Sequence, residues 1–281
     1  DERHEVVVYG YGDEPYLRYR EDGTVERNVH SEATYLNDDR QGTTDLPPDA
    51  DNAAEPEWEE VAGDGAYAWH DHRIHWMGNQ PPPGTGPGDV VLDWTVELSV
   101  DGTAARVRGT LTRVAGVSPL PWLATGLAAA AVTLVAGRRR PVRAAGVASL
   151  VAAAGAAAIG GAQHAAAPAG AGADPLLVVV PAVGVGAAIA ALVLRDRMPG
   201  PVALLASAAA TIGWAVLRAP VLWKPVLPTE APAALDRAVT AGALGLALAA
   251  AGLVVWSGAL VLRPRPDMAR AAATDGGGGP R

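Results

Sequence analysis

Hydrophobic and polar positions follow two different patterns along the chain, and the change falls near residue 119. Before it, apolar and polar side chains alternate over short runs, most regularly in residues 90–100. Alternation with a period of two is typical of a half-buried β-strand. After it, apolar runs long enough to cross about 30 Å of hydrocarbon recur. The pattern therefore predicts an exported, sandwich-like β-rich domain followed by an all-α region of five transmembrane helices.

The predicted β-rich domain comprises residues 1–118. Its strand-like runs are 6–9, 16–19, 25–29, 90–100 and 105–114. Asp22-Gly23 and Asp101-Gly102 mark hairpin turns between successive runs. An acidic, proline-containing stretch at 37–57 is typical of a surface loop.

The predicted helical region comprises residues 119–263. Its spans are 120–136, 144–162, 176–194, 201–217 and 239–262. The basic residues between and after them concentrate in three places: Arg138, Arg139, Arg140 and Arg143; Arg195 and Arg197; Arg263, Arg265 and Arg270. The positive-inside rule places these arginines in the cytoplasm, so the β-rich domain lies outside the cell membrane. Residues 264–281 are then a disordered cytoplasmic tail.

The chain begins at Asp1 without a methionine or an apolar leader, and strand-like residues follow almost at once. We therefore expect that a signal peptide has been removed or that the N-terminus is truncated.

Charge and composition narrow the function classes. Residues 1–118 carry 24 acidic and 9 basic side chains, whereas residues 119–281 carry 6 acidic and 13 basic ones. An acidic domain repels phosphates, which argues against nucleic acid as a partner. The chain has no cysteine, which excludes disulfides and thiolate metal sites. No triad or paired-carboxylate signature is recognisable, so we expect a protein that is not an enzyme.

The predicted spans contain no Asp, Glu, Lys or Arg, and such residues usually mark a transport path. This composition favours a packed membrane anchor. The alternative is that the helices carry a small molecule, with His164 at the outer end of the second span.

Residues 69–77 contain three of the six histidines of the chain. In a strand, His70 and His72 would project from one face, and His75 would face the other side unless a turn intervenes. Imidazole, carboxylate and thioether ligands together suit copper, and imidazoles also suit zinc. The candidate metal ligands are His70, Asp71, His72, His75 and Met77, with His30 as a further one.

A structural role for the same segment stays open. Trp69 and Trp76 are candidate core residues, and Asp71 and Arg73 a candidate surface ion pair. The histidines would then bond to backbone carbonyls. The protein would be a non-enzymatic envelope or interaction module rather than one that binds or delivers metal.

Several motifs resemble those of a family of uncharacterised actinobacterial membrane proteins with exported domains. The resemblance is carried by Val8-Tyr9-Gly10-Tyr11, Glu14-Pro15-Tyr16-Leu17, Ser31 with Ala33-Thr34-Tyr35-Leu36-Asn37, and Trp69-His70-Asp71-His72-Arg73-Ile74-His75-Trp76-Met77. It covers about residues 6–115 and implies an exported β domain on a helical anchor. It also implies a signal peptide and a further β segment before this region, and neighbourhoods of copper-handling exported proteins. The partners we expect are the lipid bilayer and a metal-handling or envelope protein. The chain departs from the family pattern at Glu32, where proline is expected.

Overall fold

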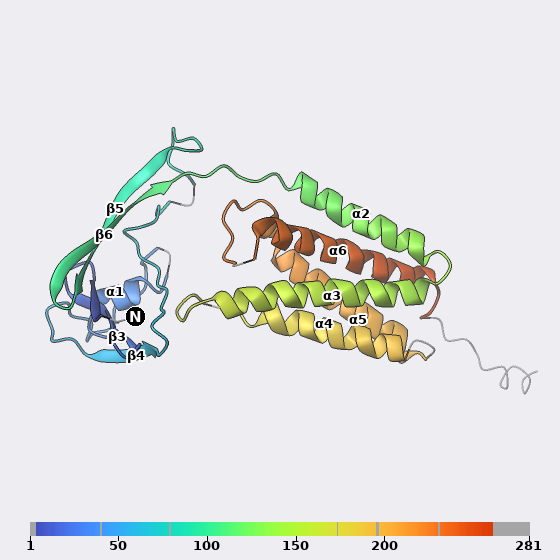
Figure 1. Ribbon diagram of the computed structural model, residues 1–281, viewed down its shortest axis with the longest axis horizontal. Coiled ribbons are helices and arrows are strands. Elements are labelled where there is room, and N and C mark those ends of the chain that lie inside the picture. Colours follow the sequence, from blue (N-terminus) through green and yellow to red (C-terminus); the bar gives the residue numbers. More distant parts are fainter. Residues whose placement is uncertain are drawn as a thin grey trace, which may run out of the picture. The chain divides into compact units, whose positions relative to one another are not determined.

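The computed structural model describes residues 4–39, 41–78, 80–172, 174–194, 197–229 and 231–260. The chain divides into two compact units (Figure 1). The sheet unit comprises Asp1–Gly116 and Ala166–Asp174, and the helical unit comprises Val117–Ala165 and Pro175–Arg281. Each unit is described by itself. The tail predicted at 264–281 lies outside the described residues.

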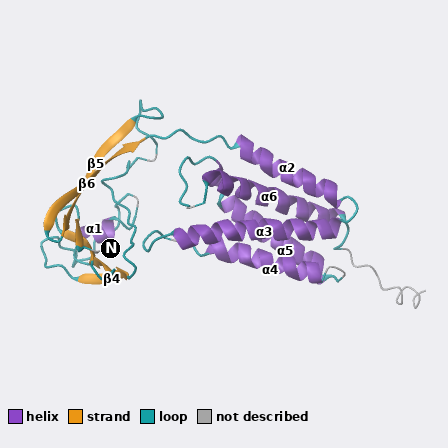
Figure 2. Cartoon of the chain, viewed as in Figure 1, coloured by secondary structure: helices purple, strands orange, loops and turns teal. Residues whose placement is uncertain are grey.

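The sheet unit is built on one six-stranded antiparallel sheet (Figure 2). Its strands are β1 Val6–Tyr9, β2 Pro15–Tyr19, β3 Val25–Asn28, β4 Trp58–Ala62, β5 Val90–Val100 and β6 Thr103–Thr112. Their order across the sheet is β4-β3-β2-β1-β5-β6. The predicted fold class, a β-rich domain followed by five apolar helices, is confirmed.

The β5–β6 hairpin forms at the predicted turn. Asp101 and Gly102 have φ angles of 48° and 73°, which are the left-handed values that a tight two-residue turn needs. Glycine adopts such angles without steric cost, and aspartate tolerates them better than most residues. The local sequence therefore determines this hairpin.

The short helix α1, Glu32–Leu36, was missed by the sequence pattern. Five residues are too few to show a helical period. Its start is nevertheless specified locally, because the Ser31 hydroxyl accepts a hydrogen bond from the backbone N–H of Ala33 at 3.2 Å.

The core of the sheet unit is a cluster of buried side chains from the central strands and α1. Its buried members come from β1, β2, α1 and β5: Val8, Tyr16, Leu17, Ala33 and Val96. Trp69 and Ile74 pack against this cluster from the loop between β4 and β5. The histidine-containing segment is therefore attached to the core through apolar side chains on both sides of His70 and His72.

In the part of the helical unit that the structure describes, five helices are long and apolar enough to cross a membrane. They are α2 Leu120–Gly137, α3 Pro141–Ala166, α4 Leu176–Val193, α5 Pro199–Leu217 and α6 Ala233–Trp256, with a short 3₁₀ helix η1 at Ala219–Leu222. Helix α2 packs against α6, and α5 packs against both α4 and α6 (Figure 1). These features are those of a multi-pass membrane protein.

Packing inside the bundle uses small and weakly polar residues. The clusters between α3, α4, α5 and α6 consist largely of alanine, with Leu204, Trp214 and Leu253 among the larger members. Large apolar side chains face outward instead, such as Leu127 at 73% and Val193 at 76% exposure. This distribution suits lipid, in which small residues allow close helix approach and apolar surface need not be hidden.

The bundle also contains a buried ion pair that the predicted spans left out. Helix α6 begins before residue 239, so Asp236 and Arg237 lie within it. Asp236 is fully buried, and both of its oxygens lie 2.7 Å from Nη2 of Arg218, which follows α5. Gln163 of α3 accepts a further hydrogen bond from Arg218. The predicted spans themselves contain no ionisable side chain, and the ion pair lies just beyond them, at one end of α5 and α6.

Candidate metal centre

The histidine segment forms a turn, the alternative to a strand in which His75 is not held on the opposite side from His70 and His72. Residues 70–78 belong to no strand, and Ile74 donates its backbone N–H to the carbonyl of Asp71 at 3.2 Å. The Asp71 carboxylate accepts the backbone N–H of Arg73 at 3.0 Å, which stabilises the turn locally. This side chain to backbone bond uses an N–H that a neighbouring strand would otherwise pair with, so it competes with strand formation. The turn returns His75 toward His70.

The turn brings together the three imidazoles of His70, His72 and His75. One ring nitrogen from each lies within 4.8 Å of those of the other two. Ring centroids are separated by 4.2 Å for His70 and His75, 5.2 Å for His70 and His72, and 5.5 Å for His72 and His75. All three residues are partly exposed, so an ion can reach them from solvent.

The closest pair is Nε2 of His70 and Nε2 of His75, which lie 2.6 Å apart. Two nitrogen lone pairs repel at this distance, so a proton or a cation must lie between them. Nitrogen ligands about 2.0 Å from a tetrahedral ion are about 3.3 Å apart. The two nitrogens would therefore have to separate by about 0.7 Å to share one such ion.

The second nitrogen of two of these rings faces a backbone carbonyl. His72 Nε2 lies 2.9 Å from the carbonyl oxygen of Asp39, and His75 Nδ1 lies 3.0 Å from that of Trp76. A carbonyl only accepts, so these nitrogens carry the hydrogen and the lone pairs reside on His72 Nδ1 and His75 Nε2. Metal-binding histidines are usually oriented by such bonds.

The Asp39 carbonyl is itself held by a loop that the Asp39 carboxylate organises. This carboxylate accepts backbone N–H groups of Gln41 at 2.6 Å, Gly42 at 2.7 Å and Thr43 at 3.0 Å. The hydroxyl of Thr44, together with these N–H groups, lowers the pKa of Asp39 to about 2. The loop therefore keeps a charged, bonded conformation at neutral pH and supports His72.

Asp71 has a positioning role next to the histidines. Its side chain is buried, and its oxygens accept from Arg73 Nε at 2.9 Å, Arg73 Nη2 at 2.7 Å and Trp69 Nε1 at 3.2 Å. Burial opposes ionisation, but these hydrogen bonds outweigh it and hold the pKa of Asp71 below its usual value. The predicted ion pair with Arg73 is present, but its carboxylate is buried and not at the surface.

Tyr11 connects the turn to the sheet. Its hydroxyl accepts the backbone N–H of His72 at 3.0 Å and donates to Asn37 Oδ1. The Arg73 guanidinium lies over its ring, 5.2 Å from the centroid. Burial raises the pKa of Tyr11 above its usual value, so the hydroxyl remains protonated and available as a donor.

Two other predicted ligands, Met77 and His30, are not members of the three-histidine cluster. Met77 is 42% exposed, two residues after His75. His30 bonds through Nδ1 to the carbonyl of Glu55 at 2.8 Å and has Nε2 3.5 Å from the Glu57 carboxylate.

The two predicted core tryptophans differ in burial. Trp69 contributes to the core as predicted, whereas Trp76 is 38% exposed and donates its indole N–H to the carbonyl of Gln80 at 2.8 Å.

Sequence reasoning missed Tyr11, Asp39 and Gly42. The run from Asp39 through Gly42-Thr43-Thr44 has the composition of a side chain-capped turn, which was a usable local signal. No local signal places that turn against His72, which is 33 residues away along the chain.

Fold and site together define a multi-pass membrane protein whose sheet unit carries a three-histidine cluster with carbonyl-oriented rings. Comparison with known protein families, with curated proteins and with solved structures gives no match.

Proposed function

We propose that the sheet unit binds a divalent transition-metal ion through His70, His72 and His75. The observation that carries this proposal is the convergence of one ring nitrogen from each histidine within 4.8 Å. One nitrogen of His72 and one of His75 also bond to backbone carbonyls, which leaves the lone pair on the other nitrogen of each ring. Asp71 is left out of the ligand set because Arg73 and Trp69 already occupy its oxygens.

We propose copper as the bound ion. Nitrogen sites bind Cu(II) more tightly than the other divalent first-row ions, and a thioether from Met77 would add affinity for Cu(I). Zinc is the second choice, since three imidazoles leave one tetrahedral position open for water or a partner's ligand. An open position suits an ion that is passed on, so we propose transfer to a membrane or secreted partner.

The arginine-rich loops support an orientation with the sheet unit outside the membrane. Arg138, Arg139, Arg140 and Arg143 lie between α2 and the first turn of α3, and arginines concentrate at cytoplasmic loops. The proposed protein is thus an exported metal-binding domain held at the cell membrane by five helices.

The test is a titration of the full chain in detergent micelles with Cu(II) and with Zn(II). We expect saturable binding of one ion, which is lost in the His70→Ala/His72→Ala/His75→Ala variant. The matched control replaces the three histidines outside the cluster, His4, His30 and His164, with alanine and should bind as the parent protein does. Equal binding by the two triple variants would exclude the site.

A structural module is the second candidate function. Trp69 and Ile74 pack on the core and the Asp71 carboxylate is buried against Arg73, so the segment also stabilises the fold. If that is its whole role, His70→Ala lowers thermal stability equally with and without copper. A loss of stability seen only with copper present supports the metal site instead.

A further inference from the structure

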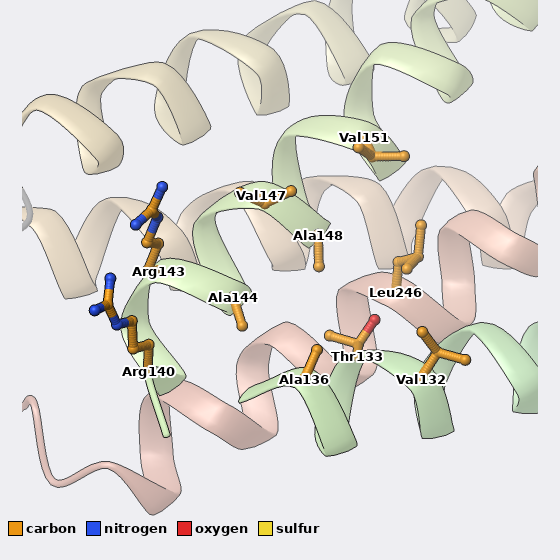
Figure 3. Close-up of a pocket in the computed structure, with 10 residues that line it drawn as sticks. All are labelled: Val132, Thr133, Ala136, Arg140, Arg143, Ala144, Val147, Ala148, Val151 and Leu246. Atoms are coloured by element: carbon orange, nitrogen blue, oxygen red, sulfur yellow. The ribbon is translucent and has the colours of Figure 1, made fainter. Parts of the chain in front are cut away.

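The helical unit has a cleft of about 420 Å³ between α2 and α3, with Leu246 of α6 also lining it (Figure 3). Its volume lies within the range of ordinary ligand pockets, about 300–1,000 Å³. The long side chains that line it are Val132, Val147, Val151 and Leu246, together with Arg140 and Arg143. Figure 3 shows the two guanidinium groups close together at one end of the cleft, away from Val132, Val151 and Leu246.

The apolar part of the cleft opens to the outer surface of the bundle. Val132 is 69% exposed, Val147 52% and Val151 56%. In a membrane this surface meets lipid chains and not water. The wall of the cleft therefore suits a hydrocarbon chain and offers little to a free, hydrated ion.

Among the residues that the structure describes, those that line the cleft include two arginines and no acidic side chain. Residues 138–143 contain four arginines and no acidic residue. Arg140 and Arg143 are both exposed, and α3 begins between them at Pro141. Two guanidinium groups side by side present several N–H donors to one phosphate group.

The distance between the two parts matches one leaflet of a bilayer. Val151 follows Arg143 by eight residues on α3, which is about 12 Å along the helix axis. Half of the hydrocarbon core of a bilayer is about 15 Å thick. With the arginines at the level of the headgroups, the apolar residues lie within the acyl chains of the same leaflet.

We infer that this cleft binds a phospholipid of net negative charge. Its phosphate lies on Arg140 and Arg143, and one acyl chain lies along Val147 and Val151 toward Leu246. Basic pockets at the ends of transmembrane helices recognise anionic lipids by this combination of charge and apolar wall. The site is separate from the histidine cluster and does not depend on the proposed metal binding.

The experiment is native mass spectrometry of the full chain released from neutral detergent micelles. Palmitoyl-oleoyl phosphatidylglycerol and palmitoyl-oleoyl phosphatidylcholine are added in turn, so that only the headgroup differs. An arginine near an anionic lipid surface is worth about a fivefold change in affinity, so two predict about a 25-fold preference for phosphatidylglycerol. Arg140→Gln/Arg143→Gln should reduce that preference to near unity.

The matched control is Arg138→Gln/Arg139→Gln, which removes the same charge from the same loop but spares the cleft. We expect it to keep most of the preference. Equal loss in the two double variants would mean a diffuse charge effect and would overturn the site.

Two further measurements test whether binding requires an acyl chain in the cleft. Val147→Trp fills the cleft and should weaken phosphatidylglycerol binding, whereas Val183→Trp, on an exposed position of α4, should not. Glycerol phosphate, which has no acyl chain, should fail to displace the lipid. Undiminished binding by Val147→Trp, or displacement by glycerol phosphate, would contradict a lipid site in this cleft.

Discussion

Gly42 lies against the imidazole of His72, so that a Cβ on Gly42 would be 2.6 Å from Cε1 of that ring. Gly42 also has a φ of +63°, where a side chain is strained. The backbone at this position thus lies against the ring of one candidate metal ligand, His72, whose Nε2 bonds to the backbone carbonyl of Asp39.

Gly42→Ala should therefore weaken metal binding by displacing His72. Gly84→Ala is a matched control, because Gly84 has a similar φ of +79° and nothing within 4 Å of its would-be Cβ. Both variants should lose about 1 kcal/mol of stability from backbone strain. Only Gly42→Ala should lower the affinity for Cu(II), measured by titration of the full chain, and equal affinities would show that His72 is not a ligand.

Metal binding should release protons. An imidazole must give up its proton before its nitrogen can bind a metal, so affinity should fall as the pH is lowered from about 7.5 to about 5. The hydrogen between Nε2 of His70 and Nε2 of His75 must leave that position before both nitrogens can bind an ion, either to solvent or to the other nitrogen of its own ring. Calorimetry in buffers of different ionisation enthalpy counts the protons, and a count near zero throughout this range would contradict a histidine site.

Asp71 should make the sheet unit sensitive to acid. Its pKa is lowered in the folded protein, so the stabilisation is complete above the unfolded value of about 3.9 and is lost as the pH falls through the lower folded value. Asp71→Asn should flatten the dependence of stability on pH below about 4, as followed by tryptophan fluorescence. Asp93→Asn, at an exposed position of β5, is the control, and the same curve for both variants would refute this assignment.

The same substitution should also destabilise the sheet unit at neutral pH. Asp71 is buried, and Arg73 is left without its carboxylate partner in Asp71→Asn. Breaking a buried pair by changing one partner costs about 3 kcal/mol. A thermal melt that shifts by no more than that of Asp93→Asn would show that the pair contributes little.

The contributions of Arg218 and Asp236 to the stability of the helical unit should depend on each other. Their side chains are 5% and 0% exposed, so either single change, Arg218→Met or Asp236→Leu, leaves a buried charge and should cost about 3 kcal/mol or more. The double variant removes both charges and should recover most of that loss. A double-mutant cycle on thermal stability in detergent measures the coupling, and additive single effects would mean that there is none.

Helices α2 and α6 should require glycine at their closest approach. A Cβ on Gly245 would overlap the carbonyl oxygen of Gly126, whereas a Cβ on Gly242 meets nothing within 4 Å. Gly245→Ala should therefore lower stability by about 1–3 kcal/mol, and Gly242→Ala on the same helix should be neutral or stabilising. Equal effects of the two substitutions would contradict the close packing of α2 on α6.

Several elements were predictable because the interactions that specify them are local. The β5–β6 hairpin is predicted by the alternation of apolar and polar side chains in Val90–Val100 and by the turn at Asp101-Gly102. Both signals depend only on residues that are close together in the sequence. The helices were predictable for a similar reason, because length and uniform apolarity are properties of one segment.

For the three-histidine site, the sequence predicted which residues belong together but not how they are arranged. The sequence alone marked His70, His72 and His75 as a group, but it left open whether His75 faces away from the other two, as in a strand, or returns to them through a turn. The turn that reunites them depends on Asp71 bonding to Arg73 and on Trp69 and Ile74 packing against the core. The orientation of His72 depends on Asp39, and the burial of Asp236 on Arg218. The Asp71–Arg73 bond is local, but the other relationships join residues distant along the chain. Their energies exist only once the chain is folded, so only the tertiary structure decided them.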